Sequence, residues 1–279
     1  GGEIGLSSEK LLGLQDVNGW TNFDALSLFL TITCEFTRLD DPNRVSAGEQ
    51  LALNPAGGAI ALLSTTRVVG AQTAINLNRS IFETVFERVG NQPKTLGDIT
   101  RISKNDQQGS TTRLKFSLIG DPAVRLAIPY YDMHITEING KSVSAASLDT
   151  LKALSKVSVK GQVSDFSGQK LDSFDGIVSV SVYDKPTQST TLVNDGIGSP
   201  IPFEQQNSLI YKGKVESVDG EFKFEFIVPK DISFQYGFGK ISLYAENNIT
   251  DAAGAYDTIL VGGFSNNPVT DDQGPLVEL

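Results

Sequence analysis

The chain has 279 residues but only one cysteine and one histidine, Cys34 and His134. A single cysteine cannot form an internal disulfide, and one cysteine with one histidine is too few for a structural zinc site. The sequence therefore predicts no bound metal and no cofactor. Cysteine counting neither favours nor excludes export of the protein.

The chain also lacks an apolar run long enough to cross a membrane as a helix. The longest, residues 25–34, is interrupted by hydroxyl side chains, and it falls short of the roughly 20 residues that such a helix needs. The chain begins at Gly1 with neither a methionine nor a charged-then-apolar leader. We therefore expect it to be part of a longer polypeptide, whose export signal would lie outside these residues.

The chain has fewer positively charged than negatively charged residues. The 23 Lys and Arg residues face 33 Asp and Glu residues, which gives a net charge of −10. The long-range field of such a chain repels phosphate backbones and anionic lipid. The sequence therefore predicts that nucleic acid is not a partner.

The first part of the chain has the pattern of an α/β domain. Up to about residue 128, short continuous apolar runs alternate with helical patterns, which is typical of strands buried on both faces of a mainly parallel sheet. The predicted strands are residues 28–33, 59–66 and 115–119. Between the first two, Ser46 and Glu49 have the spacing of a capping box, which predicts a short helix.

Two further helices are predicted after the second strand. In residues 71–89, apolar side chains recur at three- and four-residue spacings, which predicts a helix with one buried stripe. The stripe consists of Ala74, Leu77, Ile81, Phe82, Val85, Phe86 and Val89. A weaker helical pattern covers residues 95–106.

After Pro129 the apolar pattern changes to a period of two, typical of half-buried antiparallel strands. The alternating sets are Val157, Val159 and Val163; Val178, Val180 and Val182; Phe222, Phe224, Phe226 and Val228; and Ile241 and Leu243. This pattern predicts an all-β immunoglobulin-like sandwich. We therefore predict an α/β domain in residues 1–129, the sandwich in residues 130–265 and an exit linker in residues 266–279.

Cys34 is the first candidate for chemistry because it directly follows the predicted strand 28–33. Open α/β sheets place their reacting groups at the carboxyl ends of strands. A lone cysteine is more often an inert core residue, since reactivity requires an accessible thiolate. Residues 35–42 are polar and charged and cannot continue a buried strand. The sequence therefore places the thiol at the edge of the core rather than inside it.

The run TCEFTRLDDPNRVSAGEQLALNPAGGAIALLSTTR covers residues 33–67. It resembles the segment around the nucleophile of the gingipain-type, C25-like cysteine peptidases, and in particular of the sortases of the type IX secretion system. Gly1-Gly2-Glu3 resembles the residues after the histidine of the family's His-Gly motif, and Gly120-Asp121-Pro122 resembles a signature near the end of the peptidase domain. The segments YDKPTQSTTLVNDG and FIVPKDISFQYGFGKISLYA are also sortase-like. The resemblance implies an α/β caspase/gingipain-like partial domain followed by the all-β immunoglobulin-like sandwich.

Taken residue by residue, the resemblance makes Cys34 the nucleophile and puts Gly1 and Gly2 in the loop that helps to form the oxyanion hole. It puts the general base, a histidine, just before Gly1 and so outside this chain. Covalent catalysis by cysteine needs such a base, so the 279 residues alone are predicted to be inactive. His134 lies beyond the domain junction and is predicted to be structural or exposed.

The neighbours of Cys34 could shape a substrate pocket. Glu35 and Arg38 are the candidate substrate-binding residues, although Arg38 could equally hold Asp40 or Glu35 in place. Asp40 and Asp41 precede a proline and are more typical of a solvated turn. Trp20 could line a substrate subsite, but core packing is the favoured interpretation.

The function implied by the resemblance is that of a cysteine peptidase or transpeptidase, a sortase that removes the C-terminal sorting domain of type IX secretion cargo. The implied partners are secreted cargo proteins with C-terminal sorting domains and an outer-membrane anchor protein, and the implied place is the cell surface. The alternative is a non-catalytic surface binding or scaffold module of the same secretion machinery.

Overall fold

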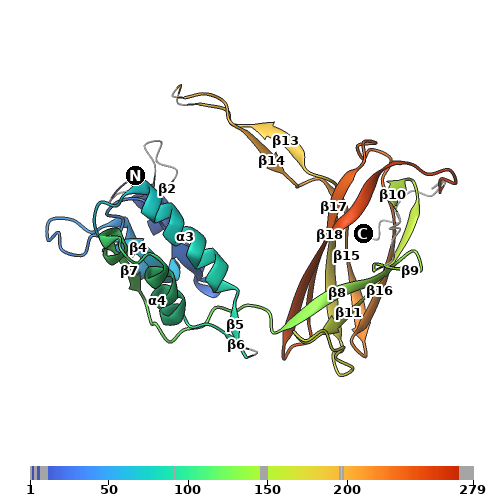
Figure 1. Ribbon diagram of the computed structural model, residues 1–279, viewed down its shortest axis with the longest axis horizontal. Helices are drawn as coiled ribbons and strands as arrows, with labels where there is room; N and C mark the ends of the chain where they lie inside the picture. Colours follow the sequence, from blue (N-terminus) through green and yellow to red (C-terminus); the bar gives the residue numbers. More distant parts are fainter. Residues whose placement is uncertain are drawn as a thin grey trace. The chain divides into compact units, whose positions relative to one another are not determined.

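The structure is a computed structural model that describes residues 2, 5–6, 12–90, 92–144, 150–194, 196 and 198–269. The chain forms two compact units, Gly1–Ile128 and Pro129–Leu279 (Figure 1). Within the described residues, no helix combines the length and the apolar character that crossing a membrane requires.

The first unit is built on a three-stranded sheet with the order β3-β4-β7. β3 (Ser27–Leu30) and β4 (Ala59–Thr65) are parallel, whereas β7 (Phe116–Ile119) is antiparallel to β4. All three predicted strands are present. Two short antiparallel pairs lie outside the sheet: β1 (Gly5–Leu6) with β2 (Leu12–Gly13), and β5 (Arg88–Val89) with β6 (Gln92–Pro93).

The first predicted strand ends earlier than expected. Its last ladder contact is the hydrogen bond that the Thr31 N–H donates to the Leu63 carbonyl oxygen at 3.2 Å. Beyond it, the chain leaves the sheet and turns at Cys34. The apolar run in the sequence therefore continues past the strand, because Ile32 belongs to the connection rather than to the ladder.

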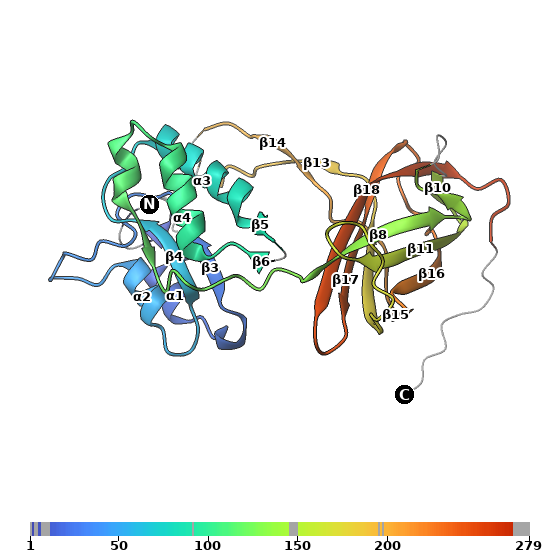
Figure 2. The ribbon, with the colours of Figure 1, turned by 60° about the horizontal axis from the view of Figure 1, so that its bottom comes forward.

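Helices cover both faces of this sheet (Figure 2). The helices of the first unit are α1 (Leu14–Asn18), α2 (Ala47–Leu53), α3 (Ala71–Val85) and α4 (Leu96–Asp106), with short 3₁₀ turns η1 (Phe23–Ala25) and η2 (Thr111–Lys115). Along β4, Ala61 and Leu63 pack with α3 and α4, whereas Leu62 packs with α1 and α2. β4 is therefore buried on both faces, as its continuous apolar run predicts.

Side-chain caps begin two of these helices. The Glu49 carboxylate accepts from the Ser46 N–H at 2.8 Å, and the Glu49 N–H donates to Ser46 Oγ at 3.5 Å. At the start of α4, Thr95 Oγ1 accepts from the Asp98 N–H at 3.1 Å. Both groups satisfy N–H donors that a helix leaves without intrahelical partners. The predicted capping box and the start of the second helix are confirmed.

The predicted buried stripe of the long helix is partly wrong. Ala74, Leu77, Ile81 and Val85 are buried, but Phe82, Phe86 and Val89 are 53%, 66% and 66% exposed. Residues at spacings of three and four can cover more of the helix surface than the face that packs on the sheet. Only the residues on that face, Ala74, Leu77, Ile81 and Val85, are buried. α3 also ends at Val85, so Phe86 and Val89 lie beyond it.

The second unit is a nine-stranded sheet with the order β10-β18-β17-β12-β15-β16-β11-β8-β9. Its strands are β8 (Tyr131–Ile138), β9 (Lys141–Ser142), β10 (Thr150–Ala153), β11 (Lys156–Ser164), β12 (Gly176–Tyr183), β15 (Leu209–Val218), β16 (Glu221–Ile227), β17 (Gly237–Glu246) and β18 (Asp251–Phe264). A parallel pairing of Ala252 with Tyr131 and of Ala253 with Asp132 joins β18 to β8. Through this pairing, β8, β11, β16, β15, β12, β17 and β18 form a closed ring.

The core of this unit consists of the side chains that the period of two points inward. All the valine, phenylalanine, isoleucine and leucine sets predicted from residues 157–243 belong to one buried cluster. The all-β prediction is therefore confirmed. The predicted sandwich would consist of two separate sheets, whereas the hydrogen bonds of the structure join the strands into one ring. A period of two reports only which face is buried, and that face looks the same in a sandwich and in a barrel.

An arm of two strands leaves the ring (Figure 1). β13 (Thr187–Thr190) and β14 (Pro202–Gln205) pair antiparallel and form a separate sheet. A buried ion pair lies at the base of the arm, where Lys185 Nζ is 2.7 Å from Asp184 Oδ1. The arm carries the exposed apolar side chains Leu192, Ile201 and Phe203.

Part of the predicted exit linker is described. Ser265 N–H donates to the Ala153 carbonyl oxygen at 3.0 Å, and Val269 N–H donates to the Leu154 carbonyl oxygen at 2.9 Å. The chain therefore continues alongside the end of β10 after β18. Residues 270–279 of the predicted linker lie outside the described part of the chain.

Candidate active site around Cys34

Cys34 lies in a turn at the carboxyl end of β3, beside the end of the parallel strand β4. Its side chain is partly exposed, and its Sγ–H donates to the Val69 carbonyl oxygen at 3.8 Å. The thiol is therefore neither sealed in the core nor far from the sheet. A thiol in such a place can meet a ligand that approaches the carboxyl ends of the strands.

The start of the chain lies close to this turn. A Cβ built on Gly2 would be 4.0 Å from the Cys34 carbonyl oxygen, so the backbones of the two residues are neighbours. Gly1, the other residue of the predicted oxyanion loop, lies outside the described residues, as does Glu3.

The turn itself is held by the end of β4. The Thr65 hydroxyl donates to the Thr33 carbonyl oxygen, and it accepts from the Phe36 N–H at 3.4 Å. The Thr37 N–H donates to the Thr65 carbonyl oxygen at 2.9 Å. Inside the turn, Glu35 has a φ of 55°, a left-handed conformation that is uncommon for a residue with a Cβ.

A second set of contacts fixes the turn against α2. The Thr37 hydroxyl donates to Ser64 Oγ at 2.7 Å, and both residues are fully buried. The Gly48 N–H donates to the Phe36 carbonyl oxygen at 2.8 Å. The turn that carries Cys34 is therefore bound on one side to the last residues of β4 and on the other to the first turn of a helix.

The first unit also carries a family signature. Residues 1–127 match the model of peptidase family C25. The match covers somewhat less than half of the chain, and over these residues the chain is similar to peptidase family C25. The resemblance to gingipain-type peptidases that the sequence predicts is thereby confirmed, and residues 1–127 are called the C25 domain from here on.

Several solved structures are similar to the chain. It is 29% identical to a chain of dimeric latent PorU from Porphyromonas gingivalis, with a TM-score of 0.48, and the match covers 77% of this chain and 21% of that one. Against the complex of the RgpB pro- and mature domains from Porphyromonas gingivalis, the identity is 14%, the TM-score 0.42 and the coverage 91% and 52%. Against the Arg-specific cysteine proteinase gingipain R, the values are 13%, 0.41, 91% and 51%. The chain thus spans between about a fifth and a half of these proteins, and no curated protein matches it.

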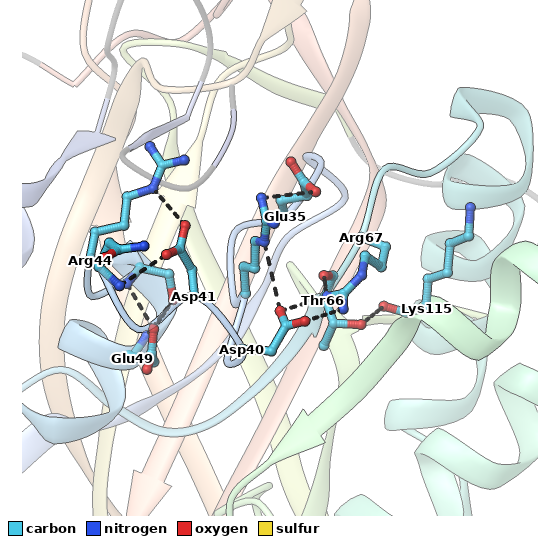
Figure 3. A network of polar contacts seen from close by, with 11 residues as sticks. Glu35, Asp40, Asp41, Arg44, Glu49, Thr66, Arg67 and Lys115 are labelled. Carbon is cyan, nitrogen blue, oxygen red and sulfur yellow. Dashed lines mark hydrogen bonds and ion pairs between the residues drawn. The ribbon is translucent and has the colours of Figure 1, made fainter.

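A network of charged side chains borders the turn in the C25 domain (Figure 3). Arg38 lies 3.7 Å from both the Glu35 and the Asp40 carboxylates. Arg67, just after β4, binds Asp40 with both terminal nitrogens, and Nη1 lies 3.0 Å from Oδ1. The two candidate substrate-binding residues, Glu35 and Arg38, therefore pair with each other. Their contact with a substrate stays a prediction.

The paired guanidinium groups change the titration of Asp40. The hydrogen bond from Arg67 is the largest cause that holds the pKa of the Asp40 carboxyl below its ordinary value of 3.8, and the positive charges of Arg67 and Arg38 act in the same direction. A lowered pKa in the folded protein means that the charged carboxylate stabilises the fold above the ordinary pKa. This contribution is lost as the pH falls through the lowered pKa.

We expect Arg67→Gln to raise the pKa of Asp40 toward its ordinary value, because it removes the strongest hydrogen bond and the nearest positive charge. The stabilising contribution of Asp40 then disappears at a higher pH than in the wild type. Carboxyl carbon titration by NMR measures the shift. The control is Arg44→Gln, since Arg44 Nε lies 3.2 Å from Oδ2 of the neighbouring carboxylate, Asp41. An unchanged Asp40 titration in Arg67→Gln would contradict the expectation.

Asp41 plays a local structural part. Its carboxylate accepts from the Asn43 N–H at 3.0 Å and from Arg44 Nε at 3.2 Å. The hydrogen bond from the Asn43 N–H, two residues after Asp41, is the turn contact expected of an aspartate before a proline. Figure 3 shows Asp41 and Arg44 near Glu49, apart from the pair of Asp40 and Arg67.

Two further candidates, Trp20 and His134, are not part of the turn that carries Cys34. Trp20 is partly buried and packs edge-on against Phe29, with 6.1 Å between the ring centroids. It also lines a hollow of about 520 Å³ with Ser27, the first residue of β3 and so the end opposite to Cys34. His134 lies on β8 in the second unit, with an exposed side chain and Nε2 at 3.6 Å from Asp132 Oδ2. Across the described residues, no group of three or more His, Cys, Asp or Glu side chains is placed to hold a metal ion.

Sequence reasoning missed the residues that hold the turn. Ser64 and Thr65 end the apolar run of β4, and both are fully buried. Two hydroxyl side chains at the end of a buried strand need hydrogen-bond partners, and this was the available signal. Their partners are residues 33–37, which no sequence spacing could identify.

Proposed function

We propose that this chain belongs to a longer cysteine peptidase in which Cys34 is the nucleophile. The observation that carries the proposal is the place of the chain's one cysteine, partly exposed in a turn at the carboxyl end of β3 within the C25 domain. The nearness of Gly2 to Cys34 adds support, because the predicted base would precede these glycines.

In the proposed reaction, the Cys34 thiolate attacks the scissile carbonyl carbon and forms a thioester. The peptide C–N bond breaks, and the leaving amine takes a proton from an imidazolium. We assign that imidazole to a histidine encoded just before Gly1, because Gly1-Gly2-Glu3 resembles the residues that follow the histidine of the family's His-Gly motif. Backbone N–H groups near Gly2 and Cys34, with Gly1 in the same loop, would stabilise the oxyanion.

The thioester can pass its acyl group to water or to an amine. In the first case the products are a carboxylic acid and the free thiol, and in the second an amide and the free thiol. The similarity of residues 33–67 to the sortases of the type IX secretion system supports a substrate of one kind: cargo proteins with a C-terminal sorting domain. We accordingly propose that the protein acts at the cell surface, beside an outer-membrane anchor protein, with Glu35 and Arg38 in contact with the substrate.

The finer fold assignment is also a proposal. A parallel pair of strands with helices on both faces is what a part of a caspase-like α/β domain would contain. The second unit buries residues at every second position of its strands, a pattern that supports the proposal of an immunoglobulin-like domain.

One observation favours a second candidate function. The arm formed by β13 and β14 exposes Leu192, Ile201 and Phe203, at 82%, 64% and 43%. Exposed apolar side chains on a protruding element favour protein docking. In this alternative, the chain is a non-catalytic scaffold module of the secretion machinery.

The reactivity of Cys34 tests the proposed nucleophile. In the longer protein, which includes the residue encoded before Gly1, we expect iodoacetamide at about pH 6 to alkylate Cys34 at least about tenfold faster in the folded than in the urea-unfolded state, because an unactivated thiol carries little thiolate at that pH. Intact-mass spectrometry measures the rate, and the 279-residue chain is the matched control that should show no acceleration. Equal rates for the folded and unfolded longer protein would reject Cys34 as an activated nucleophile.

A further inference from the structure

The Cys34 turn is closed by a side chain from another strand. In a common β-turn, the carbonyl oxygen of the first residue accepts directly from the N–H of the fourth. Here the first and fourth residues are Thr33 and Phe36, and the Thr65 hydroxyl lies between them. It donates to the Thr33 carbonyl oxygen and accepts from the Phe36 N–H at 3.4 Å. A hydroxyl can do both because it has one donor and two acceptor lone pairs.

Water cannot easily take over this bridge. Thr65 has no exposed surface, and Phe36 has none either. Buried N–H and C=O groups that lose their partner remain unsatisfied, which is unfavourable. The backbone of Thr65 also accepts from the Thr37 N–H at 2.9 Å, so the end of β4 is attached to the chain immediately after the turn. Loss of the hydroxyl would therefore leave β4 in place and release the turn.

The conformation that the bridge holds is one that the backbone does not prefer. Glu35, the third residue of the turn, has a φ of 55°, and a residue with a Cβ is strained in this region. A strained turn persists only when its surroundings hold it. The direction of the peptide between Cys34 and Glu35, and with it the direction of the thiol, depends on this conformation.

We propose that Thr65 is a positioning residue for Cys34. Its hydroxyl closes the turn, keeps Glu35 in the left-handed region and so aims the thiol at the scissile bond, without contact with the substrate. The inference rests on the proposed function for the role of Cys34. The closure of the turn, in contrast, can be measured without any reaction.

Amide hydrogen exchange measures the closure of the turn in the 279-residue chain. We expect Thr65→Val to accelerate exchange of the Phe36 amide about tenfold or more, because the bonded amide loses its acceptor. Thr65→Ser keeps the hydroxyl and should stay close to the wild type. The matched control is Thr66→Val, one residue further on, whose hydroxyl donates to the Lys115 carbonyl oxygen at 3.1 Å and does not touch the turn. Unchanged exchange in Thr65→Val would overturn the proposed closure.

Cleavage kinetics in the longer protein measure the positioning. We expect Thr65→Val to lower kcat about tenfold to a hundredfold with little change in KM, since a displaced nucleophile affects the reaction more than binding. Thr65→Ser should recover most of kcat. In a Glu35→Gly background, Thr65→Val should lower kcat by a smaller factor than in the wild-type background, because glycine adopts a positive φ without strain.

Different results would overturn the positioning role of Thr65 and the nucleophilic role of Cys34. If cleavage depends on Cys34 but Thr65→Val keeps the wild-type kcat despite faster exchange, Thr65 is structural only and the positioning role is overturned. If the Cys34→Ala protein cleaves like the wild type, the proposed function itself fails, and that result is visible without any Thr65 variant.

Discussion

Under the proposed function, Cys34→Ala in the longer protein should leave a cargo protein with its C-terminal sorting domain attached. Without Sγ no thioester can form, and the other groups near the turn offer no replacement nucleophile of comparable strength. Removal of a covalent nucleophile lowers kcat by about a thousandfold or more in peptidases. The measurement is the mass of a purified cargo protein after incubation with each enzyme, which also distinguishes release by water from transfer to an added amine.

Two controls make this result specific. Thr66→Val alters a hydroxyl near the site without touching the Cys34 turn, so it should process cargo at the wild-type rate. Cys34→Ser keeps a weaker nucleophile and tests whether the thiol itself is needed. Equal processing by the wild type and Cys34→Ala would leave the scaffold function as the remaining proposal, and the arm of β13 and β14 would then become the first surface to alter.

Gly48→Ala should destabilise the C25 domain by about 1–3 kcal/mol, the usual range for an extra carbon in a filled interior. A Cβ on Gly48 would lie 2.1 Å from Thr37 Oγ1 and 2.9 Å from the Phe36 carbonyl oxygen. Neither neighbour can move freely. Thr37 is fully buried and bonded to Ser64, and the Phe36 oxygen accepts from Gly48 itself. Urea unfolding followed by far-UV circular dichroism measures the change in free energy.

Gly70→Ala is the matched control for this prediction. Gly70 precedes α3 with a φ of −77°, and a Cβ at this position would meet no atom within 4 Å. Its free energy of unfolding should therefore stay within about 0.5 kcal/mol of the wild type. A Gly48→Ala protein as stable as Gly70→Ala would show that the turn moves aside at little cost, contrary to the close packing between α2 and the turn.

Much of the fold follows from local sequence rules. The capping box of Ser46 and Glu49 locates the start of α2, and the period of two identifies the core of the second unit. The errors have a common cause. Phe82 and Phe86 satisfy the same spacings as Ile81 and Val85 but face solvent. Which of these side chains are buried depends on where the sheet packs against α3, and the spacing does not contain that information. The closure of the ring likewise depends on β18 and β8, more than 110 residues apart.

The candidate site was predictable to a smaller extent. The position of Cys34 at the end of a strand follows from the change of composition after residue 34, and the structure has the thiol in that position. Its role as nucleophile stays a prediction, as do those of Gly1 and Gly2. The supports of the turn, Thr65 and Gly48, come from separate elements. Their importance arises from tertiary contacts, which a single sequence does not reveal.

The ring of the second unit has a consequence for the order in which the protein can mature. β8 is the first strand of the ring in the chain and β18 the last, and the two pair directly. Contacts between such distant residues form slowly, because a long intervening loop must close first. During synthesis from the N-terminal end, β8 therefore lacks this partner until β18 has been made. Chaperones that shield unpaired strand edges would be needed most in that interval.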